Sequence, residues 1–387
     1  MKFIVSRNIL LQALLHTRCY MASNVWLFKN TFQITVSDRH LIVTSTDGLI
    51  FKTEQIDLEK EIKDDPRTFY LNSTMLVKAV KSLGDQPLEF LVEEYQLTVH
   101  HSDGYFRLPL HDNQYPEPKA MTDENVMHLH LEAPGLRSQL SKVVYAAADD
   151  ELRPTICGVL MEIENNNITY VATNGHLLVR LIKKCQEDNS FISSFILPSY
   201  AVNALLKILP PTGYCELYFQ NPVGDIKRPI LKVVINDTLT IQFECIDGRY
   251  PNYKAVIPTE FTQSFQVDRR QLTKMLDRIS LFAPTSRRVK IKITPDSKVM
   301  LESRDIDENY MSSESIQCSL NGEFSKTCAR VDVNVHLLIK ILRNLYGEQV
   351  QFNLTTQNHA FTICPVPQPD IEEITALLMP MMSDDDD

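Results

Sequence analysis

The sequence has 387 residues, 44% hydrophobic and 23% charged, a composition typical of globular proteins. It carries 39 basic against 49 acidic residues, a formal net charge of -10, which argues against a protein that coats nucleic acid with its whole surface. No apolar run is long enough to span a membrane, and the amino-terminal residues lack the apolar region and cleavage site of a signal peptide, so we expect a cytoplasmic protein.

Three stretches of the chain repeat one order of predicted elements. Each opens with an amphipathic helical run, continues through alternating strands to a polar turn, and then reaches a second helical run. The first runs cover 6–22, 133–148 and 268–283, and the second runs cover 72–84, 198–210 and 332–346. Leu10, Leu136 and Leu272 occupy equivalent positions, at spacings of 126 and 136 residues. Spacings of that length predict repeated domains rather than the short units of a solenoid.

Each repeat predicts an α+β arrangement, in which two helices lie on one side of antiparallel sheets. Gly84, the Pro210-Pro211 pair and Gly347 end the three second helical runs. Asp268 and Asp332 are predicted to cap the amino-terminal ends of two helices. Polar stretches that contain proline separate the repeats. The predicted domains are residues 1–122, 127–252 and 260–382, followed by an acidic tail at 383–387.

The sequence contains no motif of a nucleotide-binding loop, a serine hydrolase or a metalloprotease, which favours a binding protein over an enzyme. The eight cysteines are dispersed without a CxxC pair, so we expect reduced thiols and no zinc. An enzyme built on three repeats stays open as an alternative, with Asp149, Asp150 and His176 as its site. A solvated acidic turn is the simpler interpretation of the adjacent acids.

Three residues on one predicted strand form a candidate metal site. His128, His130 and Glu132 alternate and therefore share one face of the strand. Imidazole and carboxylate groups are ordinary ligands of metal ions. An exposed strand face is the simpler interpretation, so we expect no metal and no cofactor.

Positive charge is concentrated in the six predicted helical runs. They hold 13 Lys or Arg residues and three acids, a net charge of +10 against -20 for the rest of the chain. Arg270, Lys274 and Arg278 recur every four residues, opposite Leu272 and Leu276. One such stripe is an ordinary solvated helix face, but six runs with few acids predict a surface that binds a polyanion without reading bases. The residues predicted to face it are Arg7, Lys78, Lys81, Arg137, Lys142, Lys207, Arg270, Lys274, Arg278, Lys340 and Arg343.

Several stretches together resemble one protein family. They are MKFIVSRNILLQAL at the start, ELRPTICGVLMEI from Glu151, VATNGHLLV from Val171, FECIDGRYPNYKAVIP from Phe243 and LLMPM from Leu377. The combination is similar to the bacterial replicative sliding clamps, the beta subunits of DNA polymerase III. With the threefold pattern, the resemblance covers essentially the whole chain.

The resemblance implies a processivity factor without catalytic activity, cofactor or metal. Such clamps have the DNA-clamp fold and form head-to-tail homodimeric rings of six similar domains, whose helices line a hole for duplex DNA. The implied partners are double-stranded DNA of any sequence, a second copy of the chain, the catalytic subunit of DNA polymerase III, the clamp loader and other proteins with clamp-binding motifs, and no membrane. Arg153, in the arginine-proline motif of the middle domain, joins the residues expected to face DNA.

The resemblance also implies a peptide-binding pocket between the second and third domains. Its expected residues are Ile156, Thr173, Gly175, His176, Leu177, Leu178, Pro251, Asn252, Val256, Leu378, Met379, Pro380 and Met381. Leu and Met side chains give an adaptable apolar lining, and Thr173 and His176 are expected to orient a peptide backbone.

The chain departs from the family pattern around this pocket. Leu177, Ala255 and Met382 stand where the family usually has arginines, and Asn252 replaces an aspartate. The rim is therefore less basic than usual, and the tail at 383–387 is expected to disfavour acidic partner peptides. The family's arginine-proline loop after the first helix is missing from residues 19–30.

A second alternative is a repeat scaffold that binds polyanions or acidic proteins without closing a ring. It shares the basic helices with the clamp interpretation, so the helices alone do not separate the two. The mass of the protein in solution does, because a ring requires a second copy.

Overall fold

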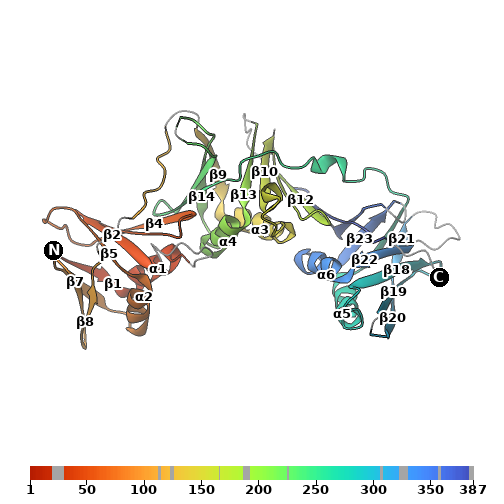
Figure 1. Ribbon diagram of the computed structural model, residues 1–387, viewed down its shortest axis with the longest axis horizontal. Helices are drawn as coiled ribbons and strands as arrows, with labels where there is room; N and C mark the ends of the chain where they lie inside the picture. Colours follow the sequence, from red (N-terminus) through yellow and green to blue (C-terminus); the bar gives the residue numbers. More distant parts are fainter. Residues whose placement is uncertain are drawn as a thin grey trace. The chain divides into compact units, whose positions relative to one another are not determined.

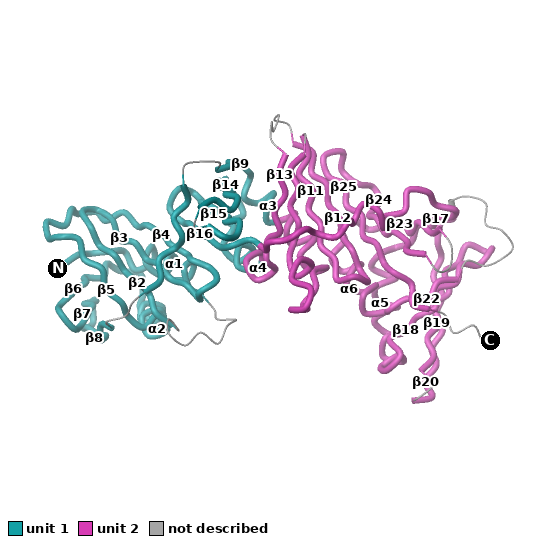
Figure 2. Tube along the Cα trace, turned by 45° about the horizontal axis from the view of Figure 1, so that its top comes forward, with its two compact units in different colours: residues 1–137, 203–245 teal, residues 138–202, 246–387 magenta. Residues whose placement is uncertain are grey.

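The computed structural model describes residues 1–19, 30–111, 115–122, 126–164, 166–185, 192–224, 226–305, 308–321, 330–355 and 359–382. The chain divides into two compact units (Figure 2). Unit 1 comprises Met1–Arg137 and Asn203–Cys245, and unit 2 comprises Ser138–Val202 and Ile246–Asp387. The tail at 383–387 and most of the segment after the first helix, 20–29, lie outside the described residues.

Unit 1 is built on two antiparallel sheets (Figure 1). The four-stranded sheet has the order β1-β6-β7-β8, and the eight-stranded sheet has the order β5-β2-β3-β4-β16-β15-β14-β9. Its elements are β1 (Lys2–Ser6), α1 (Arg7–Thr17), β2 (Thr31–Ser37), β3 (His40–Thr46), β4 (Ile50–Asp57), β5 (Arg67–Asn72), α2 (Ser73–Ser82), β6 (Pro87–Val92), β7 (Gln96–His101), β8 (Gly104–Pro109), β9 (Val126–Glu132), β14 (Tyr214–Gln220), β15 (Ile230–Ile235) and β16 (Leu239–Glu244).

Unit 2 also contains two antiparallel sheets. Their orders are β13-β10-β11-β12-β25-β24-β23-β17-β21 and β20-β19-β18-β22. The elements are β10 (Gly158–Glu164), β11 (Asn167–Thr173), β12 (Leu177–Lys184), β13 (Ser193–Pro198), β17 (Gln263–Asp268), α5 (Arg269–Ser280), β18 (Arg288–Thr294), β19 (Lys298–Asp305), β20 (Tyr310–Gln317), β21 (Ser319–Asn321), β22 (Arg330–Asn334), α6 (Val335–Asn344), β23 (Gln349–Leu354), β24 (Phe361–Val366) and β25 (Glu372–Leu378). Helices α3 (Ala133–Ser141) and α4 (Ser199–Ile208) contribute residues to both units.

The middle repeat is shared between the units because each of its sheets continues into a sheet of a neighbouring repeat. Strand β16 pairs with β4 of the first repeat, and β12 pairs with β25 of the third. Backbone hydrogen bonds therefore run without a break across the ends of consecutive repeats.

The predicted helices form, and capping explains where several of them begin. The side chains of Asn72 and Asp268 accept hydrogen bonds from backbone N–H groups in the first turns of α2 and α5. The prediction for Asp332 is wrong, because Asn334 caps α6 and Asp332 lies in β22, where only 3% of its surface is exposed. The first helices also end earlier than predicted, since α1 stops at Thr17.

Apolar faces of the helices pack into the sheets of their unit. Leu10 and Leu14 of α1 and Leu76 and Val80 of α2 belong to one buried cluster of unit 1, to which both of its sheets contribute. In unit 2, α5 packs against α6. This burial leaves the charged faces of the helices toward solvent. Among the described residues, no helix is long and apolar enough to cross a membrane.

Candidate functional site

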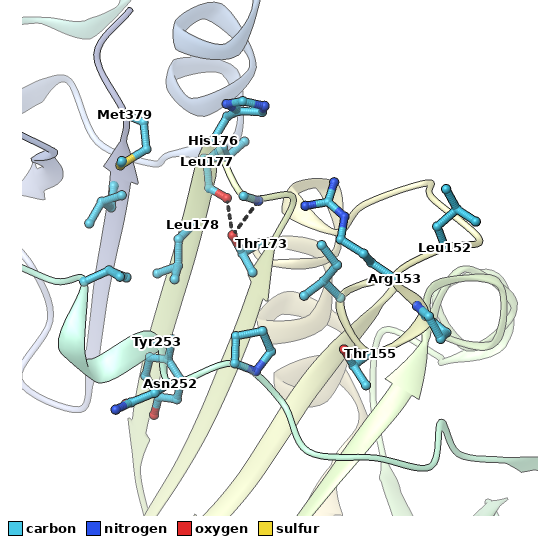
Figure 3. A pocket seen from close by; sticks show the side chains of 16 residues that line it. Leu152, Arg153, Thr155, Thr173, His176, Leu177, Leu178, Asn252, Tyr253 and Met379 are labelled. Carbon is cyan, nitrogen blue, oxygen red and sulfur yellow. Dashed lines mark hydrogen bonds between the residues drawn. The ribbon is translucent and has the colours of Figure 1, made fainter.

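A cavity of about 490 Å³ lies within unit 2, where four segments of the chain meet (Figure 3). They are the loop before β10, the turn between β11 and β12, the linker after Ile246 and the end of β25. Mostly apolar cavities of this size are typical of ligand-binding sites. The lining residues are Leu152, Arg153, Pro154, Thr155, Ile156, Thr173, Gly175, His176, Leu177, Leu178, Pro251, Asn252, Tyr253, Val256, Leu377 and Met379.

The structure brings ten of the thirteen predicted pocket residues into this lining. Leu378, Pro380 and Met381 lie outside it. Successive side chains of a strand point to opposite faces, so Leu377 and Met379 share the cavity side and Leu378 is fully buried on the other. After the strand, the backbone N–H of Met381 donates to the carbonyl oxygen of Asp332 at 2.7 Å, which directs this residue toward β22.

The turn between β11 and β12 fixes one wall of the cavity. The side-chain oxygen of Asn174 accepts hydrogen bonds from the N–H groups of His176 (3.0 Å) and Leu177 (2.9 Å). The hydroxyl of Thr173 donates to the carbonyl of Leu177 (2.7 Å) and accepts from the N–H of Gly175 (3.1 Å). Gly175 has φ +91°, a conformation that favours glycine. Thr173 therefore stabilises the turn as well as lining the cavity.

The linker forms a second wall because two tyrosines anchor it to the middle repeat. The hydroxyl of Tyr253 hydrogen bonds with a carboxylate oxygen of Glu162, and the hydroxyl of Tyr250 donates to the carbonyl of Val171 at 3.5 Å. Burial, and then the hydrogen bond with Glu162, raise the pKa of Tyr253, so its phenol keeps its proton and acts as the donor. Tyr253 also lines the cavity, although the sequence analysis did not predict it as a pocket residue.

The carboxyl-terminal segment is held at both ends of its passage along the cavity. The backbone N–H of Met379 donates to the carbonyl of His176 at 2.9 Å, and Arg288 Nη2 donates to the carbonyl of Met382 at 3.1 Å. These bonds keep the side chain of Met379, which is 42% exposed, at the cavity. An exposed thioether beside an apolar cavity is suited to contact with varied partners.

Two of the basic residues predicted to face DNA serve as caps for neighbouring helical turns. Arg7, the first residue of α1, donates from Nε to the carbonyl of Val80 (3.0 Å) and from Nη2 to that of Lys81 (2.9 Å). Arg137 donates from Nη1 to the carbonyl of Leu209 at 3.1 Å. The last carbonyls of a helix lack partners within the helix, so these hydrogen bonds satisfy them. A cation at this end also interacts favourably with the negative end of the helix dipole.

The third repeat uses the same device. Arg269, the first residue of α5, donates from Nε to the carbonyl of Gly347 (2.8 Å) and from Nη1 to that of Leu342 (2.9 Å). Part of the basic charge of the helices therefore joins the two helices of a repeat and is not free for a ligand.

Three further predicted DNA-facing residues pair with carboxylates. The pairs are Lys142 with Glu372, Arg278 with Glu314, and Arg343 with Asp277. The ammonium of Lys142 also lies 5.0 Å from the centre of the Tyr346 ring, and its side chain is only 21% exposed. These pairings reduce the positive charge that the three side chains offer to a ligand.

The remaining predicted residues on the helices present their charges to solvent. Lys78 and Lys81 on α2, Arg270 and Lys274 on α5, and Lys340 on α6 are exposed, and their side chains form no hydrogen bond or ion pair with any described residue. Lys207 on α4 is exposed as well. The exposed cations are thus spread over both units.

Models of the DNA polymerase III beta subunit match the chain at 1–119 with the N-terminal domain, at 130–252 with the central domain and at 254–382 with the C-terminal domain. The chain belongs to the DNA polymerase III beta subunit family.

Individual relatives agree with this assignment. The beta sliding clamp of Treponema pallidum is 27% identical over 318 residues, 80% of each chain, and that of Halalkalibacterium halodurans is 22% identical over 94% of this chain and 96% of the relative. The solved DNA polymerase III beta subunit of Pseudomonas aeruginosa superimposes with a TM-score of 0.88 at 21% identity, covering 99% of this chain and 100% of that one. The structure from Thermotoga maritima gives 0.86 at 20% identity, with 99% of both chains covered. The predicted α+β clamp fold is confirmed.

DNA polymerase III beta subunits are processivity factors and not enzymes, so the enzyme alternative is wrong. The local geometry gives a different role for one of its proposed residues. Asp150 accepts hydrogen bonds from Arg153 Nε (2.8 Å) and from the N–H of Leu152 (3.0 Å). The hydrogen bond from Arg153, and then that from Leu152, lower the pKa of Asp150. Asp150 therefore shapes the rim of the cavity as a bound carboxylate.

Arg153 itself lines the cavity in this beta subunit, a place that its prediction as a DNA-facing residue did not anticipate. Its sequence signal was ambiguous, because an arginine-proline pair before a buried strand suits either a DNA contact or a pocket rim. The missed Leu377 had a clearer signal, since strand alternation places it on the same face as Met379.

The candidate metal residues form a different cluster in the beta subunit. His128 and His130 each hydrogen bond with one oxygen of Glu216 on β14, and their rings stack on Tyr218 (4.8 Å) and Tyr214 (4.7 Å). Glu132 has no part in it. In the described ranges, no group of three or more His, Cys, Asp or Glu residues is arranged to hold a metal ion.

Proposed function

We propose that the protein is a sliding clamp, a processivity factor that encircles duplex DNA as a head-to-tail homodimer and tethers DNA polymerase to it. Membership in the DNA polymerase III beta subunit family, and relatives named beta sliding clamp, support the function. The cytoplasmic location and the homodimer, both typical of the family, belong to the same proposal. The domain limits 1–122, 127–252 and 260–382 are proposed with it.

The observation that carries the proposal is the order in which the repeats pair their strands. Strand β4, the fourth strand of the first repeat, pairs with β16, the last strand of the second repeat. In the same way β12 of the second repeat pairs with β25 of the third. Continuing the series, β20 of the third repeat requires the last strand of a first repeat, β8. In this chain both β20 and β8 are edge strands of four-stranded sheets.

An unpaired edge with exposed apolar side chains is suited to association. At the β20 edge Tyr310 is 45% and Met311 73% exposed, and Phe282 after α5 packs edge-on against Tyr310 with the ring centres 6.4 Å apart. At the β8 edge Tyr105 is 56% exposed, and the guanidinium of Arg107 lies 4.9 Å from its ring centre. We propose that β20 of one copy pairs with β8 of the other, twice in a dimer, which closes a ring.

The observed registers give the alignment of this proposed interface. In the existing joint Phe51, which pairs with Thr46 within its hairpin, lies opposite Gln242, and the corresponding residues of the repeat are Met311, which pairs with Arg304, and Arg107. Met311 of one copy then lies opposite Arg107 of the other. Opposed residues of antiparallel strands have Cα atoms about 4.5 to 5.5 Å apart, a distance that a disulfide spans.

Cysteine cross-linking tests the homodimer. The double variant Met311→Cys/Arg107→Cys should give a covalent dimer on mild oxidation, whereas each single variant should stay monomeric on a denaturing gel. Light scattering of the unmodified protein should give twice the mass of one chain. A monomer in solution that still binds duplex DNA would favour the scaffold alternative that binds polyanions or acidic proteins without a ring.

For DNA contact we propose the exposed cations on the helices, Lys78, Lys81, Lys207, Arg270, Lys274 and Lys340. Lys and Arg contacts to phosphates hold duplex DNA without regard to sequence, so the ring remains free to move along it. Arg7, Arg137, Lys142, Arg153, Arg278 and Arg343 contribute less, because each has a partner within the protein.

For tethering we propose that the cavity of unit 2 takes short apolar peptide segments of the DNA polymerase III catalytic subunit, the clamp loader and other proteins with clamp-binding motifs. Its lining of Leu, Ile, Val, Pro and Met side chains supports this use. The proposed peptide-binding residues are Ile156, Thr173, Gly175, His176, Leu177, Leu178, Pro251, Asn252, Val256 and Met379, with Tyr253 and Leu377 added.

A further inference from the structure

One end of the cavity carries a leucine that has almost no contact with the rest of the protein. The side chain of Leu152 is 91% exposed, although it lines an apolar cavity. Figure 3 shows it at the opposite side of the cavity from Met379, beyond Arg153 and Thr155. A single exposed leucine is ordinary on a protein surface, but at the mouth of a cavity it extends the apolar lining toward any segment bound there.

The charges around Leu152 are predominantly negative. Glu151 directly precedes it and Asp149 lies two residues further back in the same loop. Both are exposed and form no hydrogen bond or ion pair with a described residue. Arg153 is the one Lys or Arg among the lining residues, and its Nε lies 2.8 Å from a carboxylate oxygen of Asp150. The loop from 149 to 153 therefore offers two free carboxylates and a guanidinium that is already paired.

We infer that this end of the cavity selects partner segments in which an apolar side chain is flanked by Lys or Arg. The apolar side chain packs against Leu152 and the neighbouring Pro154, and the cation lies near Asp149 and Glu151. Segments with Asp or Glu in the same place, and nucleic acid, are repelled by the two carboxylates. The inference rests on the proposed function in one respect, that the cavity binds peptides.

The inference predicts a particular dependence on salt. Both carboxylates are exposed, so each contributes the modest energy of a surface ion pair, and the Debye length of about 8 Å at 0.15 M ionic strength screens them. The preference for basic segments should therefore be strongest at low salt. The apolar contact with Leu152 should persist at high salt, because burial of apolar surface does not depend on charge.

Peptide selection on the full-length protein tests the inference. We start from a displayed library of random peptides of about ten residues, long enough to cross a cavity of this kind. Peptides are selected that bind the unmodified protein but do not bind the Met379→Ala variant. The selected sequences should be rich in Lys and Arg next to one apolar position. The best peptide and its Lys/Arg→Glu version are then titrated against the protein and its variants at two salt concentrations.

We expect the basic peptide to bind about three- to tenfold more tightly than its acidic version at low salt, the effect of one or two exposed ion pairs. Asp149→Asn/Glu151→Gln should abolish most of this ratio. The matched control Glu59→Gln/Asp65→Asn removes the same charge from exposed positions of unit 1 and should leave the ratio unchanged. Leu152→Ala should weaken both peptides alike, by about tenfold, because it removes apolar contact only.

The outcomes separate two failures. Equal affinities for the basic and acidic peptides, or a ratio that survives in Asp149→Asn/Glu151→Gln, would overturn the inference and leave the peptide pocket intact. A library that yields no peptide sensitive to Met379→Ala would overturn the peptide pocket itself.

Discussion

Two neighbouring arginines on α5 should separate the stability of the protein from its binding to DNA. Arg269 donates to the carbonyls of Gly347 (2.8 Å) and Leu342 (2.9 Å) at the end of α6. Arg270 is exposed and its side chain has no partner among the described residues. Replacing each by alanine removes one positive charge from the same turn of the helix, so the two variants control for one another.

The expected magnitudes follow from these contacts. A hydrogen bond from a charged donor contributes about 1.5 to 3 kcal/mol, less where water competes, and a cation at a helix carboxyl-terminal end adds about 0.3 to 1 kcal/mol. One of the two bonds is exposed, so we expect Arg269→Ala to lower the free energy of unfolding by about 1 to 2 kcal/mol. That loss lowers the melting temperature by about 2 to 8 °C for a cooperative unit of roughly 150 to 250 residues. Arg270→Ala should stay within about 0.5 kcal/mol.

Binding to a short duplex, followed by fluorescence anisotropy between about 50 and 200 mM salt, gives the second measurement. Arg270→Ala should reduce the slope of log K against log salt by about 0.9 for each copy of the dimer whose Arg270 contacts a phosphate. Arg269→Ala should leave the slope unchanged. Equal losses of melting temperature, or a slope altered by Arg269→Ala alone, would refute the division of the basic residues into helix caps and DNA contacts.

Three further predictions concern the pocket, the histidine cluster and the tail. Met379→Ala should reduce the affinity for a pocket-binding peptide by about 1 to 2 kcal/mol in calorimetry and leave the homodimer intact, and an unchanged affinity would count against the pocket. Burial raises the pKa of Glu216, but hydrogen bonds with His130 and His128 outweigh it and hold the pKa below its ordinary 4.5. Glu216 thus stabilises the fold above pH 4.5 and loses this effect as pH falls through its folded pKa, so melting curves of Glu216→Gln should show a smaller loss of stability on acidification. Deleting 383–387, which lie outside the described residues, should strengthen binding of acidic-flanked peptides at low salt and leave neutral peptides unaffected; equal effects on both would make the tail a spacer.

Much of the architecture could be predicted from the sequence, because the helical and strand spacings of apolar residues recur in each of the three repeats. The helical runs around Leu10, Leu136 and Leu272 do form helices, and the strands that follow them are antiparallel as expected. The division into two units could not be predicted in this way. It depends on backbone pairing between β4 and β16 and between β12 and β25, which no local pattern encodes.

The basic residues show a second limit. Arg7 and Arg270 look alike in sequence, each being a cation in the first turn of a helix. Only the fold reveals that Arg7 reaches the end of α2 while Arg270 points to solvent. In the pocket, the apolar residue types predicted the apolar lining correctly. The hydrogen bonds of the Thr173 hydroxyl with Leu177 and Gly175 could not be predicted from residue type, because they depend on the shape of the turn.

Retention on circular and linear DNA tests the central proposal most directly. The protein is loaded onto a nicked circular duplex, and the fraction that remains bound is measured by gel filtration before and after one restriction cut. A ring held by topology stays on the circle through a high-salt wash and leaves the linear product over its free ends. Equal retention on the circle and on the linear DNA, or loss from the circle in high salt, would contradict the encircling clamp.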